Sequence, residues 1–122
     1  MIIDNLDDVE YNIQLAILAN KSITKSGIVI NSDTLESTFS SCIYYETERL
    51  QCCSIINKLA QNQSFEDGNK RTAFLMLLYY NENYNLGLLK KSDLEYGNII
   101  LDIAVNHWSP EKTCKILFGK MK

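Results

Sequence analysis

Apolar side chains recur every three or four positions through most of this chain, and that spacing is the period of an α-helix. The first such stretch covers Leu6 to Asn20, where Val9, Ile13, Ala16 and Ile17 form one stripe. The pattern predicts a first helix that packs one face against the rest of the domain.

A polar loop of residues 22–32 follows, and it contains the short apolar piece 28–30. Asp33 and Glu36 then stand at the spacing of a capping box, which predicts a second helix through about Ser40. Beyond this helix, residues up to 47 fit neither the helical nor the strand period.

A third helix is predicted over residues 48–60, where apolar side chains again return at helical spacing. A fourth helix should begin at Asn69 or Lys70. Its segment 73–80 is apolar on every side. A helix without a polar face belongs at the centre of its domain, so the fourth helix is the expected core helix.

Two strong helix starts lie near the C-terminus. Ser92 and Glu95 form a second capping-box pattern, and residues 109–111 place a cap, a proline and an acid in the preferred order. Gly119 should end the sixth helix. The sequence therefore predicts an all-α fold, a compact single domain over residues 1–122 with about six helices and a short flap.

Composition narrows the class of protein. The chain has 122 residues, of which 46% are hydrophobic, and this suits one packed domain. Its formal charge of −3 provides no basic stripe, so no direct nucleic-acid binding is expected. No apolar run reaches the ~18 residues of a membrane span, and the N-terminus lacks the basic region of a signal peptide. The four cysteines include a vicinal pair and no CxxC, so we expect a cytoplasmic protein with reduced thiols in its core.

Residues 62–74, NQSFEDGNKRTAF, place a polar turn directly before the apolar fourth helix. The first turn of a helix exposes unpaired N–H groups, Gly68 allows close approach, and Lys70 and Arg71 add positive charge. Together these features are suited to a phosphate, and Asp67 could hold Mg²⁺ against it. The plainer interpretation is that Asp67 caps the helix, Gly68 makes the turn, and both cations are solvated.

The longer pattern favours the phosphate site. QSFEDGNKRTA resembles the signature of the Fic/Doc family, H-x-F-x-[D/E]-G-N-[G/K]-R, and only the leading histidine is missing. The lysine before RTA, and Phe74 where the AMP-transferring Fic branch tends to carry a second arginine, indicate the Doc (death-on-curing) branch. The matching residues are Phe65, Asp67, Gly68, Asn69, Lys70 and Arg71.

The resemblance implies a toxin of a toxin–antitoxin pair. Such a protein transfers a phosphate from ATP or another nucleoside triphosphate to a hydroxyl of a target protein, which for Doc-type toxins is a translation factor. Asp67 would position Mg²⁺, and Gly68, Asn69, Lys70 and Arg71 would hold the phosphates. Tyr44 and Tyr45 stand where the family keeps a flap that aligns the target, although two tyrosines could equally cover the core.

Gln63 occupies the place of the histidine that acts as general base in the family. A carboxamide can orient a hydroxyl but cannot accept its proton, and general-base catalysis contributes roughly 10²–10⁴-fold. Activity should therefore be impaired while nucleotide binding persists. Gln63 fits either a natural loss of the histidine or a deliberate exchange that disarms a toxin.

Two other functions stay open from the sequence. One is a catalytically silent module with this fold that binds nucleotide or a partner protein, and the other is an AMP transferase. The single histidine, His107, lies outside the motif, so a structural contact is expected of it rather than catalysis.

Overall fold

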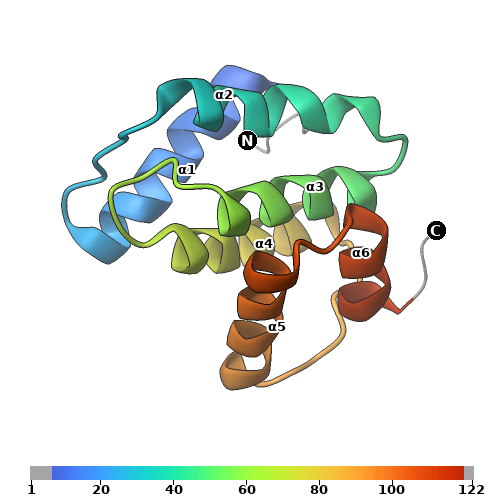
Figure 1. Cartoon of the computed structure of the whole chain (residues 1–122). Helices are drawn as coiled ribbons and strands as arrows, with labels where there is room; N and C mark the ends of the chain where they lie inside the picture. The colour runs from blue at the N-terminus through green and yellow to red at the C-terminus, as the bar shows by residue number, and fades with distance from the viewer. Residues whose placement is uncertain (1–6, 120–122) are drawn as a thin grey trace.

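A computed structural model gives the structure of residues 7–119. This part of the chain is all-helical, as the sequence predicts, and 73% of the structure is helix. In chain order the elements are α1 (Val9–Thr24), α2 (Ser32–Ser40), the 3₁₀ helix η1 (Ser41–Tyr44), α3 (Glu48–Gln61), α4 (Asn69–Tyr84), α5 (Asp93–Asn106) and α6 (Pro110–Phe118) (Figure 1).

The central helix is α3, and the prediction that α4 occupies this place is wrong. α3 packs against η1, α2, α4, α5 and α6, and its residues 52–57 are all buried. α4 packs against α1, α3 and α5, which leaves one side toward solvent, where Leu78 is 39% exposed. The apolar run of α4 therefore reflects three packing partners rather than complete enclosure.

α1 buries polar side chains on the face that the sequence marks as apolar. Its fully buried residues are Asn12, Ala16 and Asn20, whereas the predicted stripe residues Ile13 and Ile17 are half-buried. The helix also continues to Thr24, past its predicted end. Both asparagines satisfy their amides by hydrogen bonds to other elements, which makes their burial possible.

The helix caps follow the sequence closely, with one exception. Ser92 and Glu95 form the predicted capping box. The side chain of Ser109, which directly precedes Pro110, accepts a hydrogen bond from the Lys112 N–H. α2 is capped two residues earlier than predicted, because the side chain of Asn31, not Asp33, accepts from the Thr34 N–H. Gly119 ends α6 with φ of 89°, as expected.

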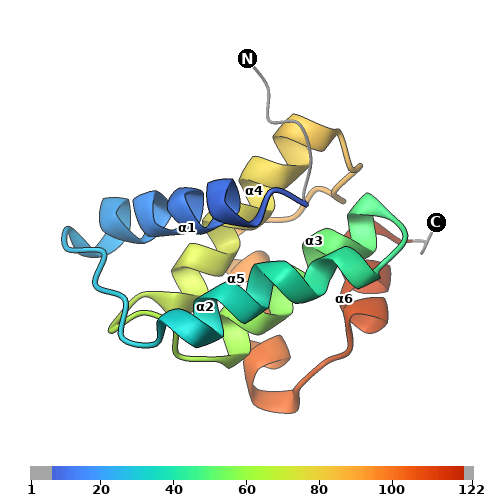
Figure 2. The same cartoon turned by 90° about the horizontal axis from the view of Figure 1, so that it is seen from above.

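The segment expected to form a flap is helical only in its first part, because Tyr45 already has an extended backbone. Residues 41–44 form η1, and Tyr44 is 84% exposed, so it does not cover the core. An extended segment lies elsewhere: Val29 forms an isolated antiparallel bridge with Phe65, and the Glu66 N–H donates to the Ile28 carbonyl at 3.0 Å. The loops before α2 and before α4 accordingly run side by side in Figures 1 and 2.

The cysteines belong to the core. All four are buried and free, as predicted, and burial together with the nearby Asp7 carboxylate raises the pKa of the Cys42 thiol to about 11. No helix within residues 7–119 is both long and apolar enough to cross a membrane.

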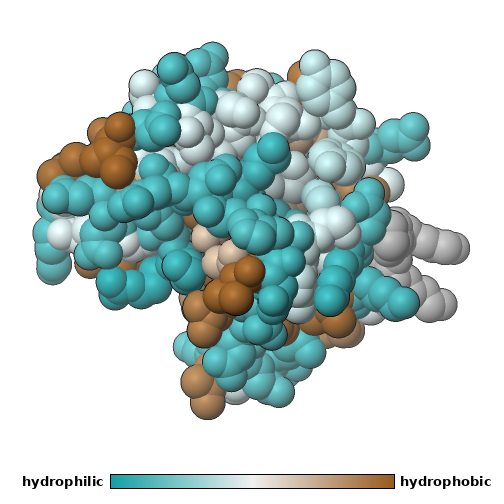
Figure 3. Space-filling view, viewed as in Figure 1, coloured by the Kyte–Doolittle hydropathy of each residue, from teal (hydrophilic) through white to brown (hydrophobic). Residues whose placement is uncertain are grey.

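Some apolar side chains remain on the surface. The brown areas of Figure 3 lie over the loop between α1 and α2 and over α5. The exposed large apolar residues of that loop are Ile28 and Ile30, and those of α5 are Leu94, Leu101 and Val105.

Candidate functional site

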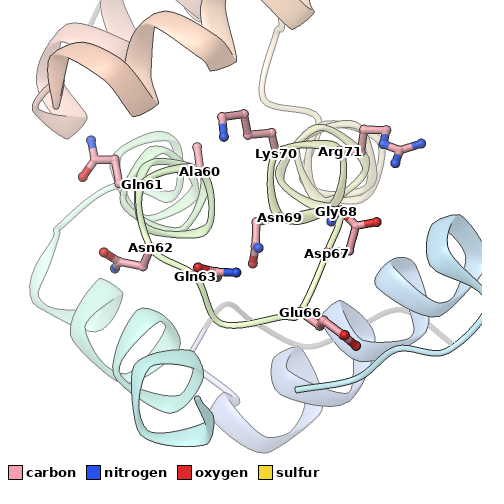
Figure 4. A pocket seen from close by; sticks show the side chains of 10 residues that line it. All are labelled: Ala60, Gln61, Asn62, Gln63, Glu66, Asp67, Gly68, Asn69, Lys70 and Arg71. Carbon is pink, nitrogen blue, oxygen red and sulfur yellow. Dashed lines mark hydrogen bonds between the residues drawn. The ribbon is translucent and has the colours of Figure 1, made fainter. Parts of the chain in front are cut away.

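A pocket of about 520 Å³ lies between the C-terminal end of α3 and the N-terminal end of α4 (Figure 4). We call it the Gly68 pocket. It brings together all the motif residues to which the sequence assigns nucleotide or metal binding, and most of its lining residues are polar. The lining residues are Ala60, Gln61, Asn62, Gln63, Glu66, Asp67, Gly68, Asn69, Lys70 and Arg71.

Gly68 is required at the start of α4 by the shape of the backbone and by its neighbours. Its φ of 76° lies in the left-handed region, which disfavours any side chain. A Cβ atom added there would lie 2.9 Å from Thr24 Cγ2 and 3.3 Å from Asn20 Nδ2. The turn before α4 can therefore press directly against the C-terminal end of α1.

The N-terminus of α4 differs from those of the other helices. Among the six α-helices of the described range, α4 is the one without a side-chain cap. The Gly68 N–H donates to Asp67 Oδ1 at 2.8 Å, and the Thr72 N–H begins the helical ladder by donating to the Gly68 carbonyl. Within residues 7–119, the N–H groups of residues 69–71 have no protein acceptor, and all three residues line the pocket.

Asn69 serves the loop itself. Its Oδ1 accepts from the Phe65 N–H and its Nδ2 donates to the Phe65 carbonyl, both at 3.0 Å. Phe65 is fully buried. The side-chain amide of Asn69, to which the sequence assigns phosphate binding, thus holds the main chain of the buried Phe65. Asn69 therefore contributes to the pocket chiefly through its main chain.

The two cations point in different directions. Figure 4 shows Lys70 extending from α4 toward α3, beside Ala60, whereas Arg71 points away from Gln63 on the far side of α4. Both side chains are exposed. Lys70 is therefore the better placed of the two to face a ligand in the pocket.

Gln63 is exposed at the junction of two pockets. A second pocket of about 480 Å³ shares Asn62 and Gln63 with the Gly68 pocket and extends along α2 past Asp33 and Ser37. The residue at the place of the family histidine therefore faces both spaces.

Three other candidates of the sequence lie apart from the pocket. Tyr44 and Tyr45 lie at the far end of α2 and line neither pocket. His107 is the exposed C-cap of α5, in the left-handed conformation with φ of 51°, and it also lines neither of them. The extended segment beside the motif is 28–31, not the tyrosine pair.

Sequence reasoning missed the contribution of α1. The Asn20 side chain donates from Nδ2 to the Asp67 carbonyl at 2.7 Å, although the two residues are 47 positions apart. The available signal was the repeat of Asn12 and Asn20 at a spacing of eight residues, which places both on one helix face. Glu66, which adds a carboxylate to the pocket, was also missed.

The resemblance to the Fic/Doc family implies a bound Mg²⁺, so the Gly68 pocket should contain carboxylates that can hold this ion. In the described range no three Cys, His, Asp or Glu side chains gather closely enough to hold a metal ion. Mg²⁺ needs only one or two protein carboxylates when phosphates complete its shell. Asp67 and Glu66 both line the pocket with exposed side chains, so the residues fit this mode of binding.

Comparison of the chain with protein-family models, with curated proteins and with solved structures gives no match.

Proposed function

We propose that this chain is a Doc-like toxin, a phosphotransferase scaffold that binds a nucleoside triphosphate in the Gly68 pocket. The observation that supports this best is the N-terminus of α4. It has no side-chain cap, and it opens into the Gly68 pocket beside Lys70. Unpaired N–H groups, the positive end of the helix dipole and a lysine ammonium together attract phosphate oxygens. The resemblance of residues 63–73 to the Fic/Doc signature agrees with this assignment.

The proposal assigns roles to six of the pocket residues. Main-chain N–H groups of residues 69–71 and the Lys70 ammonium bind the phosphates. Asp67, with Glu66 beside it, would hold Mg²⁺, which neutralises charge that develops on the phosphates during transfer. The target hydroxyl approaches Gln63 from the second pocket, whose lining is polar. The target is a protein of the translation machinery, and an antitoxin protein restrains the toxin.

Gln63 limits the chemistry. Its amide can donate a hydrogen bond to the target hydroxyl or accept one from it, but it does not take the proton at neutral pH. Transfer in this chain therefore depends on positioning and electrostatics, and both persist when the base is lost. We expect Gln63→His to raise transfer by roughly 10²-fold or more.

The test uses ATP labelled on the γ- or the α-phosphate, a bacterial lysate, and the Gln63→His protein beside the unchanged chain. Label from γ-labelled ATP on a lysate protein supports phosphotransfer. Label from α-labelled ATP overturns it in favour of AMP transfer. An Asp67→Asn change in the Gln63→His background should abolish either signal if the carboxylate holds the metal.

A silent binding module is the second candidate, and it is favoured by a glutamine at the place of the base. It predicts that nucleotide binds to the unchanged chain, measured by calorimetry, while neither label moves even with Gln63→His. Absence of nucleotide binding as well would exclude the phosphotransferase and leave only a module that binds a partner protein.

A further inference from the structure

Asn20 connects α1 to the turn before α4 through its side-chain amide. The residue is 1% exposed, and its Nδ2 donates to the Asp67 carbonyl at 2.7 Å and to Thr72 Oγ1 at 3.1 Å. Its Oδ1 lies 3.1 Å from Thr24 Oγ1, whose single hydrogen is shared with the Asn20 main-chain carbonyl at 3.0 Å. Both hydrogens of the amide are engaged, and they fix the orientation of the side chain.

The bond to the Asp67 carbonyl also fixes the neighbouring N–H. The Asp67 carbonyl and the Gly68 N–H belong to one planar trans peptide, in which the two groups point in opposite directions. Because Asn20 holds the carbonyl toward α1, the N–H is directed away from α1. That N–H donates to Asp67 Oδ1 at 2.8 Å. One rigid group thus transmits the position of Asn20 to the carboxylate of Asp67, a residue that lines the pocket.

We propose that Asn20 is a positioning residue that sets the Asp67 carboxylate for a divalent cation in the Gly68 pocket. It does not touch the ligand. It acts through the Asp67–Gly68 peptide, so its loss lets the carboxylate rotate and weakens the Mg²⁺-dependent part of nucleotide binding. The cation half of the proposal depends on the proposed function, whereas the orientation of the peptide can be measured without any ligand.

The chain offers a matched control on the same helix. Asn12 is also 1% exposed and also connects α1 to α4, because its Oδ1 accepts from the Tyr80 hydroxyl at 2.5 Å. It lies eight residues before Asn20, away from the turn. Asn12→Ala should therefore destabilise the α1–α4 contact in a similar way without changing the Asp67–Gly68 peptide.

A second control separates the two acceptors of Asn20. Thr72→Val removes the Oγ1 acceptor with little change of shape and leaves the bond to the Asp67 carbonyl in place. If weaker packing between α1 and α4 caused a loss of nucleotide binding and of amide protection at Gly68, Thr72→Val would show the same loss. If the changed turn caused it, Thr72→Val would not.

The experiment measures two quantities in the full chain for Asn20→Ala, Asn12→Ala and Thr72→Val. Hydrogen exchange by NMR gives the protection of the Gly68 amide, and calorimetry gives the ATP Kd with Mg²⁺ and with EDTA. In Asn20→Ala we expect exchange at Gly68 and the Kd with Mg²⁺ each to rise by roughly fivefold, the worth of one hydrogen bond. The Kd in EDTA, and both quantities in the two controls, should change less than twofold (our threshold of about 0.4 kcal/mol).

Unchanged Gly68 exchange in Asn20→Ala, or equal effects in either control, overturns the proposal. Equal weakening of the Kd with and without Mg²⁺ overturns its cation half. If the unchanged chain binds no ATP while Asn20→Ala still speeds exchange at Gly68, the proposed function fails and the positioning of the peptide stands.

Discussion

Thr24, the last residue of α1, packs directly against Gly68 in the turn that precedes α4. An added Cβ atom at Gly68 would lie 2.9 Å from Thr24 Cγ2. This contact joins two segments far apart in sequence, and it gives Gly68 a second reason to be glycine besides its φ of 76°. The motif glycine is thus part of the packing of the domain as well as of the pocket.

Gly68→Ala should destabilise the protein by about 2 kcal/mol or more. A left-handed conformation costs an ordinary residue roughly 1–2 kcal/mol, and displacement of Thr24 adds to this cost. Urea unfolding followed by circular dichroism measures the difference.

Thr24→Ser separates the two contributions, because it removes Cγ2 but keeps the Oγ1-type hydroxyl that bonds to Asn20. Gly68→Ala should cost less in the Thr24→Ser background than alone. Equal costs in both backgrounds would show that only the backbone conformation matters.

The sequence predicts the helices of this fold better than their arrangement. Capping residues such as Ser92 and Ser109 act within one helical turn, so the sequence identifies them directly. The choice between α3 and α4 as central helix depends on which faces the other helices cover. No local pattern contains that information, and the uniformly apolar run of α4 was misleading for this reason.

The same distinction applies to the candidate site. The pocket residues from Gln63 to Arg71 lie within nine positions of the sequence, so one motif contains them all. The support from Asn20 arises only when α1 packs against the start of α4, and an asparagine on a helix carries no mark of a partner 47 residues away. Tyr44 and Tyr45 line neither pocket, and the sequence offered little to place them, because aromatic residues after a helix are compatible with many positions.

Lys70→Ala should weaken ATP binding by about tenfold, the lower end of the range for a hydrogen bond to a charged group, because the lysine is exposed. The effect should decrease with added salt, since screening reduces the attraction between the ammonium and the phosphates. Calorimetry at two salt concentrations measures both expectations.

Arg71→Ala and Lys115→Ala are the controls for charge. Arg71 lies on the far side of α4 from Gln63, and Lys115 lies on α6, so both changes remove a positive charge without altering the face of the pocket toward α3. Their effects on Kd should be less than half of the effect of Lys70→Ala. If Arg71→Ala is the stronger change, the assignment of Lys70 as the phosphate ligand is wrong.

Tyr80→Phe should destabilise the protein by about 1 kcal/mol near neutral pH, because it removes the buried hydrogen bond from the Tyr80 hydroxyl to Asn12. The effect should also depend on pH. Burial, followed by the nearby Cys52 and Cys42, holds the pKa of Tyr80 well above its ordinary value.

The direction of this pH dependence follows from the difference between the pKa of Tyr80 in the folded and in the unfolded protein. In the unfolded chain Tyr80 ionises near pH 10, while the folded protein keeps it neutral. Its contribution to stability is complete below about pH 10 and decreases as the pH rises further. The difference in unfolding free energy between the unchanged protein and Tyr80→Phe should therefore shrink between pH 9 and 11, and Tyr44→Phe serves as the control for loss of an exposed tyrosine hydroxyl.

Glu95→Gln should reduce the stability that the capping box of α5 provides, and the size of this effect should depend on pH. The Glu95 carboxylate accepts from the Ser92 N–H at 2.8 Å, and this hydrogen bond, together with the Ser92 hydroxyl, lowers the pKa of Glu95. Because the pKa of Glu95 is lower in the folded protein, the contribution of Glu95 to the free energy of unfolding is present above its unfolded pKa of about 4.3. This contribution is lost as the pH falls through the folded pKa. Urea midpoints of the unchanged protein and Glu95→Gln should accordingly differ most near pH 6–7 and converge near pH 3. Glu36→Gln on α2 serves as the control for removing one surface carboxylate, and an equal convergence there would assign the effect to net charge rather than to the cap.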